Sequence, residues 1–127
     1  MRRNVASNSP YEPVIAFSRA VRAGNQVFVS GTAAWGADGR LVSGGGYEQA
    51  KQCIANIGAA LEKAGASLSD VVRTRTYMVD IDQWEDVARA HREAFAAILP
   101  ASTLVEVSRL ASADMLVEIE ADAVVDA

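Results

Sequence analysis

The feature that most constrains the fold is an amphipathic stripe between residues 47 and 64. Apolar residues recur there at steps of three and four, which is the spacing of one face of an α-helix. They are Ala50, Cys53, Ile54, Ile57, Leu61 and Ala64. Gly65 follows and readily adopts the left-handed conformation that ends helices. Because such a stripe must be buried, the chain needs a second layer of structure to cover it.

Three later segments have the pattern of strands and can supply that layer. Along residues 71–80 and 115–125, the side chains at odd and at even positions form two different sets. This period of two is typical of half-buried strands, whose alternate residues face opposite sides of a sheet. Pro100 starts the segment Pro100–Leu110, whose β-branched residues predict a central strand. A strand that follows a helix implies a crossover connection, so we expect a mixed sheet.

The N-terminal part predicts three further strands. The pair Gly24-Asn25 lies between strand-like residues 18–23 and 26–32 and favours a tight hairpin. Gly31 interrupts the second of these strands, either as a β-bulge or because a ligand or another backbone approaches it closely. Residues 40–42 predict a short third strand.

Two more segments complete the expected architecture. The prolines around residues 11–16 predict an extended lead-in. A second helix is expected from Asp82, as its N-cap, to about Ile98, with Trp84 and Phe95 on its apolar face. The predicted order is β-β-β-α-β-α-β-β, an α+β fold with two helices on one face of a mixed sheet. The other face carries charged side chains among apolar ones, and we expect oligomerisation to cover it.

Composition narrows the classes of function. The 127 residues fit a single domain, 1–127, and with half of them apolar the chain is far from the disordered and membrane classes. The formal charge of −4 gives a nucleic acid no general electrostatic attraction, so no nucleic-acid partner is expected. Cys53 is the only cysteine, which rules out an intramolecular disulfide. Its place on the apolar stripe favours core packing over nucleophilic chemistry.

Signals for targeting, metals and cofactors are weak. No apolar segment follows Arg2 and Arg3, so we expect neither a secretory signal nor a membrane anchor and place the protein in the cytoplasm. One histidine and one cysteine give too few ligands for a metal site. The glycine triplet 44–46 is not followed by the lysine and hydroxyl residue of a phosphate loop, and no cofactor is expected.

Four segments stand in a characteristic order and spacing. They are F-S-R-A-V-R-A-G-N-Q-V-F-V-S-G at 17–31, A-G-A-S-L-S-D-V-V-R-T at 64–74, P-A-S-T-L-V-E-V-S-R-L at 100–110 and V-E-I-E-A at 117–121. Together they resemble the Rid family, the reactive intermediate deaminases, also called the YjgF family. The resemblance implies a chorismate-mutase-like fold and a barrel-forming homotrimer with small-molecule ligands in clefts between subunits. It also implies hydrolysis of small enamines or imines such as 2-aminoacrylate.

The resemblance carries specific expectations for site residues. It places Phe17, Ser30 and Gly31 in the ligand cleft and gives Glu118 the role of holding or polarising the attacking water. Ser102 stands where the family has a carboxylate-clamping arginine, and Ala88 stands where it has an asparagine. A serine lacks the charge and the planar fork of a guanidinium, so we expect an altered substrate.

The acidic residues of the last strand have alternative roles. Glu118 could instead form a cross-strand ion pair with Arg73 or Arg75, which lie on the polar side of their own strand. Glu120 is two residues on and shares the face, so it is a lesser substitute for the catalytic role of Glu118.

Three other polar residues are candidate ligand contacts. Ser102 and Thr103 could donate hydrogen bonds to a small polar ligand, or they could simply begin a strand. His91, the sole histidine, lies one turn from Ala88 on the apolar stripe of its helix. It is either a packed or interface histidine or a substitute for the missing polar groups, since imidazole titrates near neutral pH.

Two other functions compete with imine hydrolysis. A trimer that keeps the clefts but not the chemistry would be a non-catalytic small-ligand-binding or regulatory protein. An endoribonuclease is the weaker alternative, because the acidic balance and the lone histidine do not favour RNA cleavage.

Overall fold

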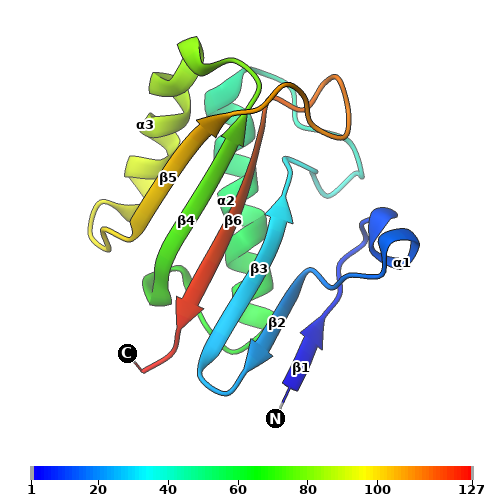
Figure 1. The fold of residues 1–127 in the computed structure, drawn as a ribbon, viewed down its shortest axis with the longest axis vertical. Helices are drawn as coiled ribbons and strands as arrows, with labels where there is room; N and C mark the ends of the chain where they lie inside the picture. The colour runs from blue at the N-terminus through cyan, green and yellow to red at the C-terminus, as the bar shows by residue number, and fades with distance from the viewer. Residues whose placement is uncertain (1, 127) are drawn as a thin grey trace.

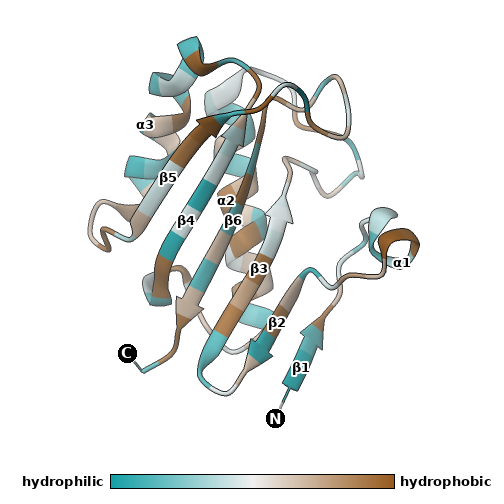
Figure 2. Ribbon diagram, viewed as in Figure 1, coloured by the Kyte–Doolittle hydropathy of each residue, from teal (hydrophilic) through white to brown (hydrophobic). Residues whose placement is uncertain are grey.

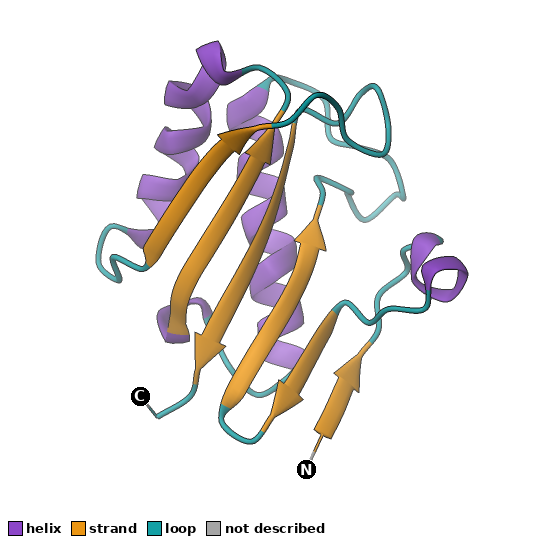
Figure 3. Cartoon of the chain, in the orientation of Figure 1, coloured by secondary structure: helices purple, strands orange, loops and turns teal. Residues whose placement is uncertain are grey.

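Two long helices lie against one face of a six-stranded sheet in the computed structural model, which describes residues 2–126 (Figures 1 and 3). The strands are β1 (Arg2–Val5), β2 (Ala20–Ala23), β3 (Gln26–Thr32), β4 (Val71–Met78), β5 (Ala101–Glu106) and β6 (Val117–Val124). The helices are α1 (Tyr11–Ile15), α2 (Gly46–Lys63) and α3 (Trp84–Phe95), with short 3₁₀ turns η1 (Leu68–Asp70) and η2 (Ile81–Gln83). The predicted α+β class is confirmed.

The sheet is mixed, with the strand order β1-β2-β3-β6-β4-β5. β4 and β5 run parallel and are joined through α3, whereas the other neighbouring pairs are antiparallel. β6 lies inside the sheet, and its alternate residues Val117, Ile119, Ala121 and Ala123 are at most 1% exposed. The core therefore lies between this face of the sheet and the two long helices, as the alternation predicted.

β5 is an edge strand, so the prediction of a central strand at Pro100–Leu110 is wrong. It pairs with β4 alone, and most of its residues are exposed. β-branched residues indicate an extended backbone on a pleated surface, but they do not determine how many neighbours a strand has.

The first strands also differ from the prediction. Residues 40–42 contribute only an isolated bridge between Trp35 and Leu41 instead of a strand. The third N-terminal strand is β1, which pairs with β2 although it begins with the charged residues Arg2 and Arg3. Pairing with the open edge of β2, rather than a local apolar pattern, makes this segment a strand.

Residues 11–15 form the short helix α1 instead of an extended lead-in. Pro10 occupies the N-cap and Pro13 the first turn, where a missing N–H removes no helical hydrogen bond. Ala16 ends the helix with φ of 71°, and its N–H donates to the carbonyl oxygen of Glu12. Glu12 is buried despite its charge, since the residue as a whole is only 6% exposed.

α2 closely matches the predicted helix, and Gly65 follows it with φ of +80°. Replacing Gly65 with alanine should lower the free energy of unfolding by about 1 kcal/mol, because residues with a Cβ are strained in this conformation. Urea unfolding measures the loss. The control is Gly58→Ala inside α2, whose new Cβ would lie 3.6 Å from Leu68 and should not destabilise the protein. Equal stability of Gly65→Ala and the wild type would contradict the prediction.

α3 is shorter than predicted and starts differently. Its N-cap position is Gln83, which makes no side-chain capping hydrogen bond, so the assignment of Asp82 as the cap is wrong. Asp82 belongs to the preceding turn η2, which is capped by Asp80, whose carboxylate accepts the N–H of Asp82. α3 ends at Phe95 rather than near Ile98. Phe95 is buried, but Trp84 is 50% exposed and does not belong to the core of this chain.

The sheet face opposite the long helices is charged, as predicted, and Figure 2 shows strongly hydrophilic bands along β4 separated by paler, near-neutral ones. Arg75 Nη1 lies 3.5 Å from Glu120 Oε1 and 3.3 Å from Asp122 Oδ2. The Tyr77 hydroxyl donates to Glu120 Oε1 at 2.7 Å. Phe28 lies opposite Asp122 on the same face and is 45% exposed. Large apolar and charged side chains therefore share an uncovered surface.

Cys53 is packed in the core. Its Sγ lies 3.7 Å from the carbonyl oxygen of Val117, and burial raises the pKa of the thiol. Both observations agree with core packing rather than nucleophilic chemistry. Within residues 2–126, no helix combines the length and apolar character needed to cross a membrane.

Candidate functional site

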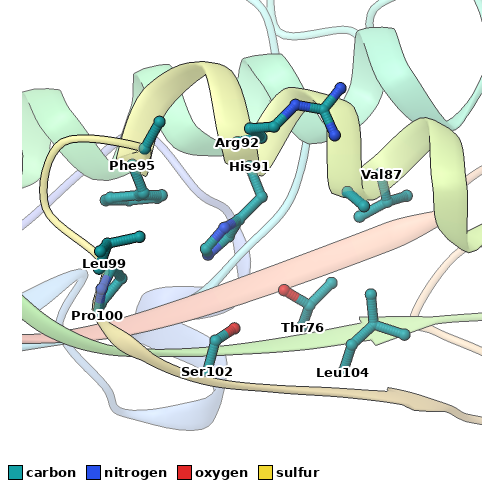
Figure 4. A pocket seen from close by; sticks show the side chains of 11 residues that line it. Thr76, Val87, His91, Arg92, Phe95, Leu99, Pro100, Ser102 and Leu104 are labelled. Carbon is teal, nitrogen blue, oxygen red and sulfur yellow. The ribbon is translucent and has the colours of Figure 1, made fainter.

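A groove between α3 and β5, with a volume of about 510 Å³, contains three of the predicted ligand residues (Figure 4). They are Ala88 and His91 on α3 and Ser102 on β5. The complete lining is Thr76, Val87, Ala88, His91, Arg92, Phe95, Ala96, Leu99, Pro100, Ser102 and Leu104. We call this site the α3–β5 groove.

A buried threonine links the two polar residues of this groove. Thr74 Oγ1 lies 2.8 Å from His91 Nε2, and the Thr74 hydroxyl donates to Ser102 Oγ at 2.9 Å. Thr74 lies beside Ser102 in the parallel register of β4 and β5 and is fully buried. The His91 ring packs on Phe95, with ring centroids 4.7 Å apart. Burial lowers the pKa of His91, so the imidazole is neutral at pH 7.

A second cavity, of about 650 Å³, lies near α1 and contains the predicted residues Phe17 and Ser30. The Ser30 hydroxyl donates to the carbonyl oxygen of Ser18 at 2.7 Å. The guanidinium carbon of Arg19 lies 5.4 Å from the centre of the Phe17 ring, close enough for a cation–π contact. We call this site the N-terminal cavity.

Gly31 and Glu118, two predicted catalytic residues, approach each other closely. A Cβ on Gly31 would lie 3.0 Å from both Cδ and Oε1 of Glu118. The pairing of β3 with β6 shifts register between Val29 and Thr32, in agreement with a β-bulge, which is one of the two alternatives for Gly31. The missing side chain makes room for the Glu118 carboxylate rather than for another backbone.

The environment of Glu118 favours its protonated form. Burial raises the pKa of the Glu118 carboxyl, the positive charge of Arg19 opposes this shift, and the negative charge of Glu120 adds to it. Arg75 pairs with Glu120 and Asp122, and no ion pair of Glu118 with an arginine of β4 is found among the described residues. The alternative role of Glu118 as a cross-strand ion-pair partner is therefore not realised in this chain.

Sequence reasoning missed Arg19, which contacts the backbone of Gly31 and whose positive charge acts on Glu118. Its Nη1 donates to the carbonyl oxygen of Gly31 at 2.5 Å and to Thr32 Oγ1 at 3.3 Å. Its Nη2 lies 3.5 Å from Glu12 Oε2, with side-chain exposures of 12% and 7% for the two residues. Arginine next to a strand usually lies in solvent, so the sequence alone gives no signal that this one is buried.

Metal binding has no structural support in the described part of the chain. No group of three or more histidine, cysteine, aspartate or glutamate side chains is positioned to hold an ion there.

Comparison with known proteins gives the family. The family model described as endoribonuclease L-PSP matches residues 7–125. The chain belongs to this family, the YjgF or Rid family. A RutC family protein from Pyrococcus abyssi is 41% identical over 111 residues, which are 87% of each chain. A 2-iminobutanoate/2-iminopropanoate deaminase from Rattus norvegicus is 32% identical over 125 residues, 98% of this chain and 90% of the relative. A YjgF family crystal structure from Mycobacterium tuberculosis has a TM-score of 0.91 at 42% identity and covers 98% of this chain and 100% of its own.

Within this Rid family chain, predicted site residues lie on opposite faces of the sheet. We call the α3–β5 groove, with Ala88, His91 and Ser102, one half-site, and the pair Gly31 and Glu118 the other. Ser102 contacts Thr74, which faces the long helices. Glu118 lies opposite Tyr77, on the outward face. One chain therefore does not bring Ser102 and Glu118 together.

Two further candidates lie outside both half-sites. Thr103 is opposite Arg75 and is exposed on the outward face, and it does not line the α3–β5 groove. The Glu120 carboxylate already accepts a hydrogen bond from the Tyr77 hydroxyl and pairs with Arg75 on the outward face.

The contact between Gly31 and Glu118 gives a prediction about acidity. Gly31→Val should displace the Glu118 carboxylate toward solvent and lower its pKa toward the ordinary value of a glutamate, because burial is the main cause of the raised pKa. Carboxyl-carbon NMR titration measures this pKa. Gly58→Ala is the control, because its new Cβ lies at an ordinary distance from Leu68. An unchanged Glu118 pKa in Gly31→Val would contradict the prediction.

Proposed function

We propose that the chain is a Rid-like hydrolase, a single domain over residues 1–127, which deaminates small enamines or imines at clefts between the subunits of a homotrimer. The observation that carries the proposal is the half-buried Glu118 carboxyl beside Gly31, two positions that match the family pattern. Relatives named as iminobutanoate and iminopropanoate deaminases, at 30–32% identity over 98% of this chain, support the same reaction class.

The reaction needs a positioned water and a proton. Water adds to the carbon of the C=N group, a proton reaches the nitrogen, and one imine and one water give one carbonyl compound and one ammonia. A carboxyl with a raised pKa exchanges protons near neutral pH better than an ordinary glutamate does. Glu118 would hold the water and pass the proton, while the bulge at Ser30 and Gly31 provides backbone groups beside it.

A complete site requires a second copy of the chain. Since Ser102 and Glu118 lie on opposite faces of one sheet, they can meet only when the α3–β5 groove of one subunit faces the Glu118 side of another. The uncovered outward face, with Phe28 at 45% and Val105 at 41% exposure, is suited to such an assembly. We propose the chorismate-mutase-like, barrel-forming homotrimer that the family resemblance implies.

The substrate is proposed to differ from an amino-acid-derived imine. Position 102 carries a hydroxyl where a carboxylate clamp would need a guanidinium, so a substrate carboxylate would lose its charge-assisted contact. Uncharged imines do not need that contact.

Ser102→Arg should raise kcat/KM for 2-iminopropanoate by about tenfold or more, because a charge-assisted contact is worth roughly 1.5–3 kcal/mol. The rate follows from coupled detection of ammonia, with the imine generated from alanine by an amino-acid oxidase. Ser108→Arg, an exposed serine outside the groove, controls for added charge. No gain in a folded Ser102→Arg protein would contradict the assigned position of the clamp.

The function itself is tested with a panel of freshly generated imines, both carboxylate-bearing and uncharged. Ammonia release should exceed the rate in buffer for at least one uncharged imine, such as the product of an amine oxidase acting on benzylamine. No acceleration for any imine would overturn the proposal.

A non-catalytic ligand-binding role is the second candidate, and the missing arginine favours it. Stabilisation by imine analogues in a thermal-shift assay without any turnover would support this role. The endoribonuclease activity in the family description stays the weakest option, because the net charge of −4 and the acidic outward face repel RNA.

A further inference from the structure

The α3–β5 groove has one neutral polar corner in an otherwise apolar wall. Val87, Phe95, Leu99 and Leu104 supply apolar surface from both sides. The polar corner consists of Ser102 and His91, whose side chains face each other across the groove in Figure 4.

A single charged side chain, that of Arg92, is found among the lining residues. Figure 4 shows the Arg92 guanidinium directed away from Ser102. An anion seated at the polar corner would therefore lose its hydration without gaining a cationic partner, and such a loss is costly.

The hydrogen bonds at this corner have a defined direction. A threonine hydroxyl carries one proton, and Thr74 donates it to Ser102 Oγ at 2.9 Å. Thr74 Oγ1 must then accept from His91, whose Nε2 lies 2.8 Å away and carries the proton of the neutral ring. The chain of donors runs from His91 through the fully buried Thr74 to Ser102.

This direction fixes what Ser102 offers to a ligand. Because Ser102 Oγ already accepts from Thr74, its own proton is directed to another acceptor, and Ser102 is exposed to the groove. Successive hydrogen bonds polarise one another, which strengthens the last donor of the chain.

We infer that the α3–β5 groove binds an uncharged molecule with an apolar body and one hydrogen-bond acceptor, a carbonyl or imine group, to which Ser102 donates. Thr74 and His91 are positioning residues that orient the Ser102 hydroxyl. The inference rests on the proposed function in that this groove is one half of the proposed site, and it names the substrate class.

Benzamide and benzoate form a matched pair of probes, since they share size and shape and differ in charge. Neither is hydrolysed as an imine, so binding is measured separately from turnover. Titration of the full chain, followed by backbone amide NMR, should show benzamide binding at least tenfold more tightly than benzoate, with shifts centred on α3 and β5.

Variants distinguish the hydrogen-bond donor, Ser102, from the residues that position it, His91 and Thr74. Ser102→Ala should weaken benzamide binding by roughly three- to tenfold, the usual effect of losing one hydrogen bond. His91→Phe should weaken it similarly, whereas His91→Gln, which keeps a donor near the Nε2 position, should restore most of the affinity. Ser108→Ala loses a hydroxyl outside the groove and is the matched control. Thr74→Val tests the link directly, and the two His91 variants carry the test if that buried substitution prevents folding.

Each outcome decides the inference. Benzoate binding as tightly as benzamide, unchanged affinity in Ser102→Ala, or no saturable binding of either probe would overturn it. If benzamide binds through Ser102 but no imine is hydrolysed, the proposed function fails and the binding site stands. If imines are hydrolysed but Ser102→Ala binds benzamide as the wild type does, the proposed function stands and the inferred binding site fails.

Discussion

Replacing Glu118 with glutamine should reduce imine hydrolysis by about 10²- to 10⁴-fold, the usual contribution of a positioned acid or base. The same substitution should raise the melting temperature at neutral pH. The carboxyl is held out of water beside Gly31, so its charged form is penalised in the folded chain. Glutamine has nearly the same shape and cannot ionise.

The stability gain should depend on pH in one direction. The folded pKa of Glu118 lies above the unfolded value, so between the two values the folded state binds more protons than the unfolded state. Stability contributed by this group is present at acid pH and is lost as pH rises through the folded pKa. The difference in melting temperature between Glu118→Gln and the wild type should therefore be near zero in acid and grow toward neutral pH.

Thermal melts across this pH range, together with ammonia-release rates, measure both effects. Asp122→Asn, which neutralises a carboxylate on the outward face, is the control and should leave hydrolysis unchanged. A Glu118→Gln protein that is less stable than the wild type at neutral pH, or that retains full activity, would contradict the role assigned to Glu118.

Replacing Arg19 with methionine should lower the free energy of unfolding by about 3–5 kcal/mol, because it leaves the buried Glu12 carboxylate without its cationic partner. The hydrogen bonds that Glu12 accepts from Ser7 would remain, but they do not neutralise its charge. Arg19 and Glu12 are the most buried ion pair among the described residues, with side-chain exposures of 12% and 7%. The substitution also removes the hydrogen bond to the carbonyl oxygen of Gly31. With its positive charge gone, the pKa of Glu118 should rise further.

Urea unfolding measures the loss of stability. Arg75→Met is the matched control, because Arg75 pairs with Glu120 and Asp122 at 38% side-chain exposure, where ion pairs contribute roughly 0–1 kcal/mol. If Arg19→Met and Arg75→Met cost the same, Arg19 is not a buried structural cation.

The parts of the fold that local periodicity specifies were predictable. The stripe of residues 47–64 and the alternation of residues 117–123 each report burial on one side, and the structure buries those sides. The hairpin at Gly24 follows from the same local rule, since its φ of +63° is one that glycine adopts freely.

The errors concern relations between distant segments. The residues of β5 do not reveal that it has one neighbour, and Arg2–Val5 becomes a strand only by pairing with β2. Trp84 has the spacing of a core residue, yet this chain has no layer to cover it. Local pattern gives a residue's preference for burial, whereas packing decides whether burial occurs.

The candidate site was predictable to the same degree. The resemblance proposed candidate residues in both half-sites, but it did not show that these residues lie on opposite faces of the sheet. Thr74 was placed only on a strand face, and its link between His91 and Ser102 depends on three segments meeting in space. The burial of Arg19 depends likewise on Glu12, seven residues away on α1.

Subunit mixing tests the central claim, that a Glu118 half-site and an α3–β5 groove from different copies together hydrolyse an imine. Glu118→Gln removes one half-site, and Ser102→Trp fills the other. Each variant alone should be inactive. In the proposed homotrimer, random reassembly from equal amounts should restore about a quarter of the wild-type activity, because one interface in four then joins two intact halves. No recovery of ammonia release from mixed trimers would contradict the account.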